Sequence, residues 1–281
     1  MKIILSRKGF DSTSGGHPSP IFPDGSMLSL PIPDKMSSIT YGEIRGNKWL
    51  SVGEAVSQLA GKPPSHRAHL DPDIVEQSVL RCGGWRPIFG QERAAEGHLQ
   101  RQGVVDGDVF LFFGLFRPVE KTDRGWRFVP KSKEIHALFG WLQIARRISV
   151  ASWSAMDSWA YYHPHFHHKG NFKNVIYVAT ERLTLPCSKH AEIDGAGVFP
   201  YLTSRLRLTA PDSDHPSRWL LPKWFNPKGH RSHLSYHGDL SRWSDAKDGV
   251  LLNAVSRGQE FVLDTADYPE AVEWLSQLFQ M

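Results

Sequence analysis

Histidine side chains gather in one stretch, residues 161–168, which holds four of the chain's fourteen histidines. On an extended backbone, side chains two residues apart point to the same face, and proline favours an extended residue before it. His163 and His165, with a proline between them, are therefore predicted to project together. Two imidazoles on one face commonly supply two of the ligands of a zinc, iron or copper site. The alternative interpretation is an exposed polar loop, which suits His167 and His168 better.

A second set of candidate metal ligands begins with His69 and Asp71. One histidine and one carboxylate at this spacing, joined by a distant histidine, form the facial triad that leaves positions on a ferrous ion open for oxygen. The same spacing occurs twice more in the chain, so spacing alone does not select this pair. The segment 71–73 is also typical of a helix-initiating turn.

Four further side chains have both a functional and a structural interpretation. His98 falls in a predicted helix and His136 begins an apolar strand, so each is a further candidate metal ligand or a hydrogen-bonded core histidine. Asp11 follows a buried strand in a glycine-rich loop, and Glu260 begins a late strand. These two carboxylates are candidate catalytic residues, as general bases or ligands, or else they cap turns.

A loop-rich region at about residues 185–247 is basic and aromatic. Between Tyr201 and Lys247 there are eight Lys/Arg and four Asp, and the whole chain carries a net charge of +4. Interleaved rings and cations can stack bases and hold phosphates. The same rings can instead anchor long loops on a core while the cations stay in water. The candidate nucleic-acid contacts are Arg205, Arg207, Trp219, Lys223 and Trp224.

Composition narrows the class of protein. The 281 residues are ordinary in their apolar and charged content and sufficient for a large core, and we expect a single domain over 1–281. The two cysteines, Cys82 and Cys187, form no CxxC pair, which argues against a disulfide scaffold or a thiolate zinc site. No run resembles a signal peptide or a membrane span, so we expect a cytoplasmic protein without membrane contact. The oligomeric state is not predicted.

Apolar patterning predicts many strands and few helices. Strands are expected at 3–7, 27–31, 39–44, 108–116, 126–129, 135–144, 173–179, 205–209, 250–255 and 261–263. Helices are expected at 51–60, where Ser51 and Glu54 form a capping box, and at 91–102 and 269–279. The predicted fold class is α+β, with a mixed or largely antiparallel, barrel-like sheet, few helices and long loops. The glycine motifs GxGxxG and GxxxxGK[ST] do not occur, which argues against a fold that binds a nucleotide cofactor.

Several of these segments resemble one known family, the third type of nucleotide-modification-associated domain. The matching motifs are Lys2-Ile3-Ile4-Leu5-Ser6-Arg7-Lys8-Gly9-Phe10-Asp11-Ser12, Gly15-Gly16-His17-Pro18, His69-Leu70-Asp71-Pro72-Asp73, His98-Leu99, the run 107–114, His163-Pro164-His165 and Gly258-Gln259-Glu260-Phe261-Val262. The resemblance covers most of the chain. It implies a role in handling modified nucleobases in DNA, and it defines no reaction.

The residues and the resemblance together predict a metal-dependent enzyme that acts on a nucleotide or on a modified nucleobase in DNA. The expected cofactor is a divalent metal ion, Fe(II) or alternatively zinc, which would activate dioxygen or water in an oxidoreductase or hydrolase reaction. Two alternatives remain open at this point. One is a non-enzymatic module that binds nucleic acid or a modified base, and the other is a metalloenzyme for an unrelated small molecule.

Overall fold

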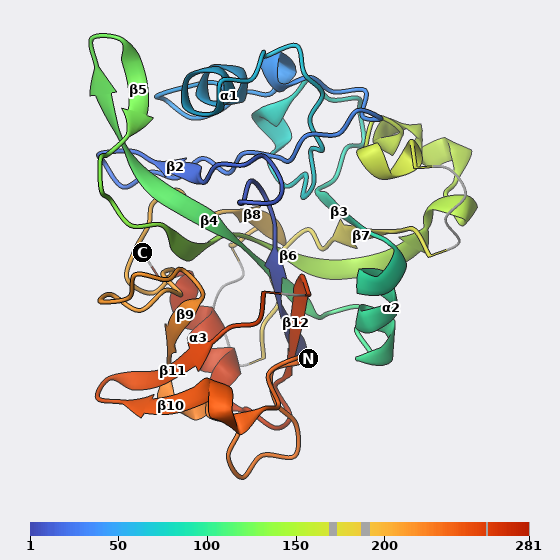
Figure 1. The fold of residues 1–281 in the computed structure, drawn as a ribbon. Coiled ribbons are helices and arrows are strands. Elements are labelled where there is room, and N and C mark those ends of the chain that lie inside the picture. Colours follow the sequence, from blue (N-terminus) through green and yellow to red (C-terminus); the bar gives the residue numbers. More distant parts are fainter. Residues whose placement is uncertain (169–172, 187–191, 257, 281) are drawn as a thin grey trace.

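The computed structural model describes residues 1–168, 173–186, 192–256 and 258–280, without the side chains of 155–157. Cys187 lies outside these residues. The described part contains three α-helices: α1 (Val52–Ala60), α2 (Arg93–Arg101) and α3 (Glu270–Leu278). It also contains twelve strands: β1 (Lys2–Arg7), β2 (Ser19–Ile21), β3 (Ile88–Gln91), β4 (Val109–Thr122), β5 (Gly125–Phe128), β6 (Ile135–Ser149), β7 (Val175–Ala179), β8 (Ala196–Val198), β9 (Arg218–Leu221), β10 (Trp243–Ala246), β11 (Gly249–Asn253) and β12 (Glu260–Asp264). The fold class is α+β, as predicted (Figure 1).

Nine strands form one mixed sheet whose main path runs β12-β1-β4-β6-β7-β3. Strand β1 is parallel to β4, and β4, β6, β7 and β3 follow one another in antiparallel pairs. The path ends at β12 and β3, so no closed barrel forms within the described residues and the barrel-like expectation is corrected. The two end strands nevertheless meet through side chains, because Gln91 Nε2 donates to Glu260 Oε1 at 2.6 Å.

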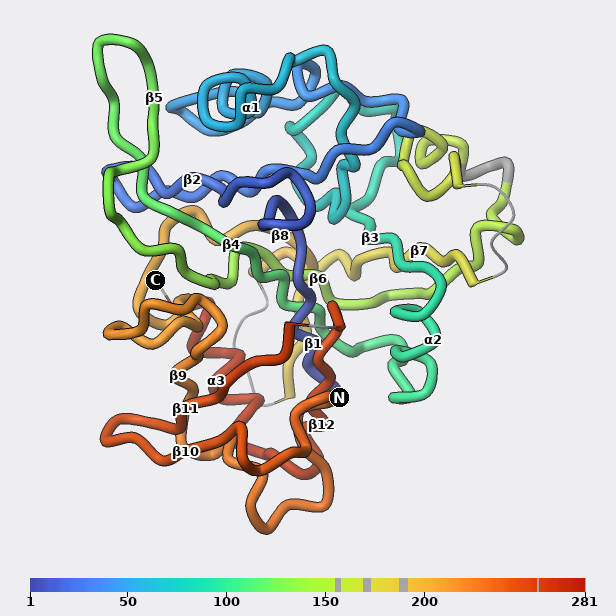
Figure 2. Tube along the Cα trace, in the orientation of Figure 1, coloured from blue at the N-terminus to red at the C-terminus, as the bar shows by residue number. Residues whose placement is uncertain are grey.

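The long strands β4 and β6 organise the core. Alternate residues of β4 point to opposite faces, so Leu111 and Phe113 pack in one apolar cluster and Phe110 and Phe112 pack in another. The strand expected at 108–116 is therefore present, and this part of β4 is buried on both faces. The Cα trace in Figure 2 shows β1, the first strand, crossing the middle of the molecule beside β4 and β12, close to the N-terminus. The C-terminal end of β1 consequently leads into the interior of the fold.

The predicted helices are present within one or two residues. Ser51 Oγ accepts from Glu54 N at 3.2 Å and Glu54 Oε2 accepts from Ser51 N at 2.8 Å, which confirms the capping box of α1. The helix ends at Gly61, whose φ of 61° is left-handed and suits glycine. α2 and α3 occupy the other two expected ranges.

Three expected strands are absent from the described structure. Residues 27–31 and 39–44 make isolated bridges and a 3-10 turn (Tyr41–Glu43), and their apolar side chains pack with α1 instead. Residues 205–209 also make only isolated bridges. The strand expected at 250–255 is present as β11, and it belongs to a separate sheet with β10 and β9. Apolar alternation identified buried segments here, but tertiary pairing decided which of them became strands. No helix in the described part of the chain could span a bilayer.

Candidate metal centre

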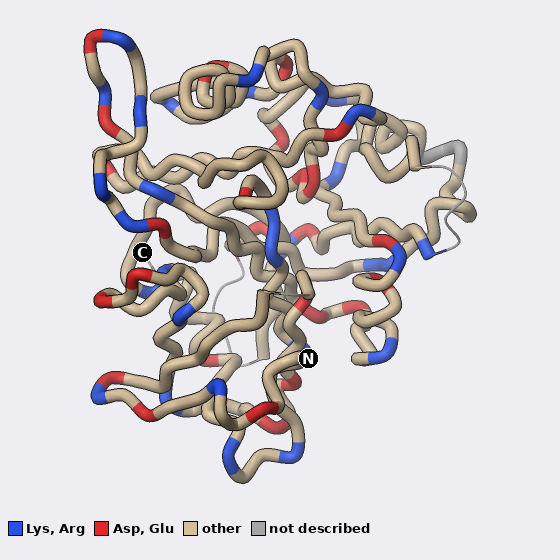
Figure 3. Tube along the Cα trace, in the orientation of Figure 1, with Lys and Arg blue, Asp and Glu red and all other residues tan. Residues whose placement is uncertain are grey.

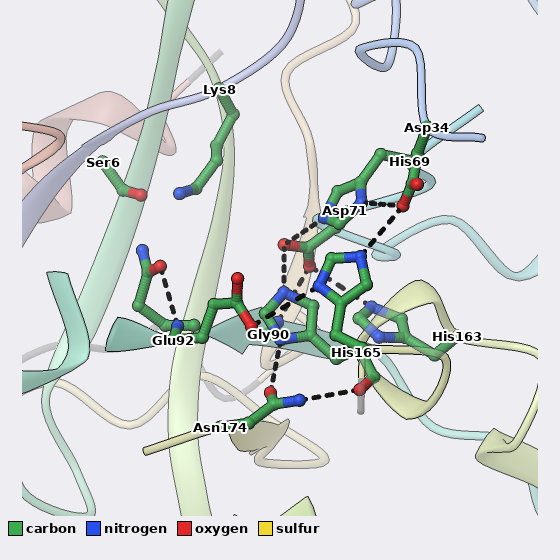
Figure 4. Close-up of polar contacts among 12 residues, drawn as sticks. Ser6, Lys8, Asp34, His69, Asp71, Gly90, Glu92, His163, His165 and Asn174 are labelled. Atoms are coloured by element: carbon green, nitrogen blue, oxygen red, sulfur yellow. Dashed lines mark hydrogen bonds and ion pairs between the residues drawn. The ribbon is translucent and has the colours of Figure 1, made fainter. Parts of the chain in front are cut away.

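Asp71 lies at the meeting point of two segments that are distant in sequence. His69 and Asp71 belong to residues 67–73, whose backbone bonds to Ile32 O on one side and to Ile88 on the other. His163 and His165 come from the 3-10 turn Pro164–Phe166 and the residue before it. Asp71 Oδ2 lies 3.8 Å from His69 Nε2 and 3.7 Å from His165 Nε2, and Asp71 Oδ1 lies 3.3 Å from His163 Nε2. Figure 4 shows these side chains pointing toward one another.

Neighbouring groups hold two of these rings with one nitrogen facing Asp71. His69 Nδ1 lies 2.8 Å from Asp34 Oδ2, and His165 Nδ1 lies 2.6 Å from Asn174 Oδ1. Both partners accept a hydrogen bond, so each ring in its neutral form carries its proton on Nδ1 and turns the Nε2 lone pair toward Asp71. Asp71 is held in turn by Gly90 N, which donates to Oδ1 at 2.8 Å. The arrangement brings two imidazole nitrogens and a carboxylate to one point.

His163 is fully buried, and neither of its ring nitrogens makes a hydrogen bond within the described structure. Most buried polar atoms in folded proteins have a hydrogen-bonding partner, so an imidazole without one is unusual. Its Nε2 nevertheless lies beside the Asp71 carboxylate. A cation between them would satisfy both groups.

Burial and the neighbouring groups shift the pKa values of Asp71, His163 and His165. Burial by itself would raise the pKa of Asp71, but interaction with His163 and His165 outweighs it and lowers this pKa well below its usual value. Burial lowers the pKa of His163, although Asp71 opposes the effect. For His165, burial lowers the pKa but Asp71 and Asn174 raise it by more, so the pKa lies above its ordinary value. The Asp71 carboxylate is therefore ionised at neutral pH, as a metal ligand must be.

His168 joins the cluster, contrary to the prediction of a solvated extension. Its Nε2 lies 3.3 Å from Asp34 Oδ2 and its Nδ1 lies 3.4 Å from Glu92 Oε2. Two groups of three residues, the ligand triplets, each bring their ligand atoms within 4.8 Å of one another. One group is His69, Asp71 and His165, and the other is Asp34, His69 and His168. The chain folds back after the turn Pro164–Phe166, which returns His168 to His69.

A family model covers almost all of this chain. The model for nucleotide modification associated domain 3 matches residues 2–264. The chain belongs to the nucleotide modification associated domain 3 family. Neither the curated proteins nor the solved structures give a significant match. The resemblance expected from the sequence is thereby confirmed, and a role in nucleotide modification follows from the family.

The family motifs that meet in space are the His69–Asp71 and His163–His165 segments. Both segments were predicted to supply candidate ligands, but the sequence did not select which candidates meet His163 and His165. The backbone between His163 and His165 was expected to be extended and is a 3-10 turn. The rings still face the same carboxylate, with centroids 5.5 Å apart. His163 is the extended residue before the turn and His165 lies within it, and from these two positions both imidazoles reach the Asp71 carboxylate.

His98 and His136, also proposed as ligands, have other partners. His98 Nε2 lies 3.0 Å from Ser235 Oγ, and the ring stacks on Tyr236. His136 Nδ1 accepts from Trp219 Nε1 at 3.0 Å, and burial followed by nearby Arg7 lowers the pKa of His136 to about 4. The structure brings neither histidine into the ligand triplets. Both instead have the hydrogen-bonded role that was the alternative interpretation.

A cavity of about 530 Å³ opens beside the cluster. Its lining includes His69, Asp71, His165 and His168 together with residues from the end of β1, the loop after it, and the first turn of α2. Asp11 lines the cavity, and its Oδ1 accepts three hydrogen bonds from Thr13 and Ser14, so it also caps its turn. Glu260 is 1 % exposed and lies behind the lining residues Lys8 and Gln91, to which it is hydrogen-bonded.

The candidate nucleic-acid contacts mostly have structural partners. Trp219 is fully buried, so its ring is not available to a base, which corrects its assignment. Arg205 donates to the carbonyls of Gln277 and Gln280 at the end of α3, and Arg207 donates to Thr209 O. Trp224 stacks on Phe225, whereas Lys223 is exposed. Figure 3 shows acidic and basic residues interspersed over this region.

Sequence reasoning did not select Asp34, Asn174, Glu92 or Lys8. Asp34 and Asn174 are single polar residues with no motif around them, and only the folded chain places them against His69 and His165. Lys8 stands within a family-like segment, yet its position on the cavity depends on where β1 ends. No signal in a single sequence distinguishes these residues from ordinary surface groups.

Proposed function

We propose that this protein is a metal-dependent enzyme that modifies a nucleotide or a nucleobase in DNA. His69, Asp71 and His165 would hold a divalent metal, and His163 lies close enough to Asp71 to complete the set. The family's association with nucleotide modification supports a nucleotide or nucleobase substrate, and the His/Asp cluster supports a bound metal.

The observation that carries the proposal is the buried, unpartnered His163 beside an ionised carboxylate that two further imidazoles approach. His69, His165 and Asp71 give the two histidines and one carboxylate of non-haem Fe(II) sites, with His163 as a fourth donor beside Asp71, and zinc accepts the same donors. We favour iron because this set leaves coordination positions open. A metal bound here would supply Lewis acidity or an open position for dioxygen or water.

The chain's own residues would prepare the site. Asp34 and Asn174 orient His69 and His165, and Gly90 N orients the carboxylate of Asp71. The adjoining cavity would seat the substrate, and Asp11, on its wall, is the carboxylate that we propose as a general base. Glu260 is farther back and acts, in our proposal, through Lys8 and Gln91.

Metal analysis tests this function. We expect the purified protein, reconstituted without oxygen with Fe(II) and separately with Zn(II), to retain about one metal ion per chain after desalting. The His163→Ala/His165→Ala variant should retain little, whereas His66→Ala, at an exposed histidine outside the triplets, should behave as wild type. Equal and negligible metal in all three proteins would refute the proposal. Product analysis with nucleotides and with DNA would then separate hydrolysis from oxidation.

A further inference from the structure

A second set of side chains lines the same cavity as the metal cluster. β1 ends at the cavity, so Arg7 and Lys8 both line it, together with Gln91 from the end of β3. In Figure 4 the Lys8 side chain ends on the Ser6 side of the cluster. The cavity therefore joins a candidate metal site to a cationic wall.

The ammonium group of Lys8 is held in one position. Lys8 Nζ lies 3.0 Å from Glu260 Oε1, which also accepts from Ser6 Oγ at 3.0 Å and from Gln91 Nε2 at 2.6 Å. Its Nζ also lies 4.6 Å from the centre of the Phe89 ring. The Lys8 side chain is only 11 % exposed, so little freedom remains to be lost when a ligand binds.

Lys8 has hydrogen-bonding capacity left after these contacts. An ammonium group has three N–H donors, and one of them has a partner, Glu260 Oε1, within the described structure. Because Lys8 lines the cavity, a ligand there can accept from the remaining donors. The ligand group that fits is an oxygen acceptor with several lone pairs.

Arg7 adds charge without a carboxylate partner. Its Nη2 donates to the backbone oxygens of Ser256 at 2.9 Å and Gly258 at 3.3 Å, and no ion pair to Arg7 occurs among the described residues. Lys8 is balanced by Glu260, but Arg7 is not. This part of the lining thus combines a fixed ammonium donor with a guanidinium that pairs with no described carboxylate, a combination that favours an anionic group beside the end of β1.

We propose that Arg7 and Lys8 bind a phosphate group of the nucleotide substrate, with Glu260 and Gln91 as the residues that position Lys8. This inference rests on the proposed function, and it adds that the substrate is phosphorylated and enters with its phosphate against the end of β1. A cavity of about 530 Å³ lies within the size range of sites for small ligands. The phosphate can belong to a free nucleotide or to one nucleotide of a DNA strand.

Binding measured by calorimetry on chelator-treated, metal-free protein tests the inference. The ligands are the four deoxynucleoside 5′-monophosphates, the four matching nucleosides and a single-stranded oligonucleotide of mixed sequence. We expect at least one phosphorylated ligand to bind tenfold or more tightly than its nucleoside counterpart. Preference for a mononucleotide assigns the site to free nucleotides, and binding of the oligonucleotide alone assigns it to a DNA strand. Equal affinity for nucleosides and nucleotides, without oligonucleotide binding, overturns the inference.

Variants locate the effect. Lys8→Met should remove most of the preference for phosphate, and the Lys8→Met/Glu260→Gln variant repeats the test without leaving a buried carboxylate unpaired. Lys133→Met, which removes an exposed lysine paired with Asp214, is the matched control and should keep the preference. An unchanged preference in both Lys8 variants contradicts the assignment. The capacity to retain metal is measured separately on the reconstituted protein. If that protein retains no metal but the phosphate preference still depends on Lys8, only the proposed metal-dependent function is refuted.

Discussion

The side chain of Asn174 holds His165 at two points. Its Oδ1 accepts from His165 Nδ1 at 2.6 Å, and its Nδ2 donates to the His165 backbone oxygen at 2.7 Å. Asn174 is 2 % exposed and immediately precedes β7, so the ring of a candidate ligand is tied to the start of an interior strand of the main sheet. Both the orientation of this ring and its protonated nitrogen depend on one amide.

Replacement of Asn174 tests that dependence. We expect Asn174→Ala to weaken metal binding about 10- to 100-fold, because partners of metal-bound histidines have effects of this size. Competition with a chelator of known affinity measures the change. Asn226→Ala, at a partly exposed asparagine whose side chain donates to Asp245, is the control and should leave the affinity unchanged. Identical affinities for Asn174→Ala and wild type would show that the amide has no role in metal binding.

Gly90 packs directly against His165. A Cβ added at Gly90 would overlap the imidazole ring of His165. This ring is held by Asn174 and is not the flexible end of a long side chain that could move aside. We therefore predict that Gly90→Ala displaces His165 and lowers metal affinity at least tenfold. Gly83→Ala is the matched control, because a Cβ there meets no atom within 4 Å and the backbone is not left-handed. Retention of full affinity in Gly90→Ala would argue that His165 is not a ligand.

A buried ion pair joins the two ligand-bearing segments. Arg81 contacts both carboxylate oxygens of Asp73, at 2.7 and 2.5 Å, and Tyr162 OH donates to the same carboxylate. Removing one partner leaves the other charge buried, so Arg81→Met should lower the free energy of unfolding by about 3–5 kcal/mol. Urea denaturation measures this change. Arg127→Met, in an exposed pair with Glu120, should cost about 1 kcal/mol or less, and equal effects would contradict the buried role.

His237 makes stability depend on pH. It is fully buried, its Nδ1 donates to Ser235 O at 2.9 Å, and its Nε2 accepts from Val255 N at 3.1 Å, so the ring is held neutral. Burial lowers the pKa of His237 from 6.5 to about 4. The unfolded chain binds a proton first as pH falls, so this contribution is complete above pH 6.5 and is lost as pH falls toward 4.

The size of the loss follows from the shift. At about 1.4 kcal/mol per pKa unit, His237 contributes on the order of 3 kcal/mol to the change in unfolding free energy across this range. Urea denaturation at several pH values, compared between wild type and His237→Gln, isolates this contribution from that of the carboxylates. The variant should be less stable at pH 7 but should lose less on acidification. If the unfolding free energies of the two proteins changed with pH in parallel, His237 would not be a source of the pH dependence.

Local patterns in the sequence determined much of the fold. The apolar run of β4, the capping box at Ser51 and the amphipathic C-terminal helix each depend on neighbours within a few residues, and each was predicted. Residues 27–31 and 39–44 were predicted as strands and are not, because their apolar side chains found partners in α1 instead of in a sheet. Whether the main sheet closes likewise depends on pairing between β3 and β12, which are far apart in the sequence and do not pair through their backbones.

The candidate site divides in the same way. By itself the sequence determined that His69, Asp71, His163 and His165 have the chemistry and spacing of metal ligands. Only the tertiary structure decided that His98 and His136 lie elsewhere, that His168 returns to the cluster, and that Lys8 reaches the same cavity. Residue type and short spacing are local properties, whereas a coordination shell requires atoms from segments some ninety residues apart to meet within a few ångströms. Backbone pairing and burial, summed over the whole chain, bring those segments together.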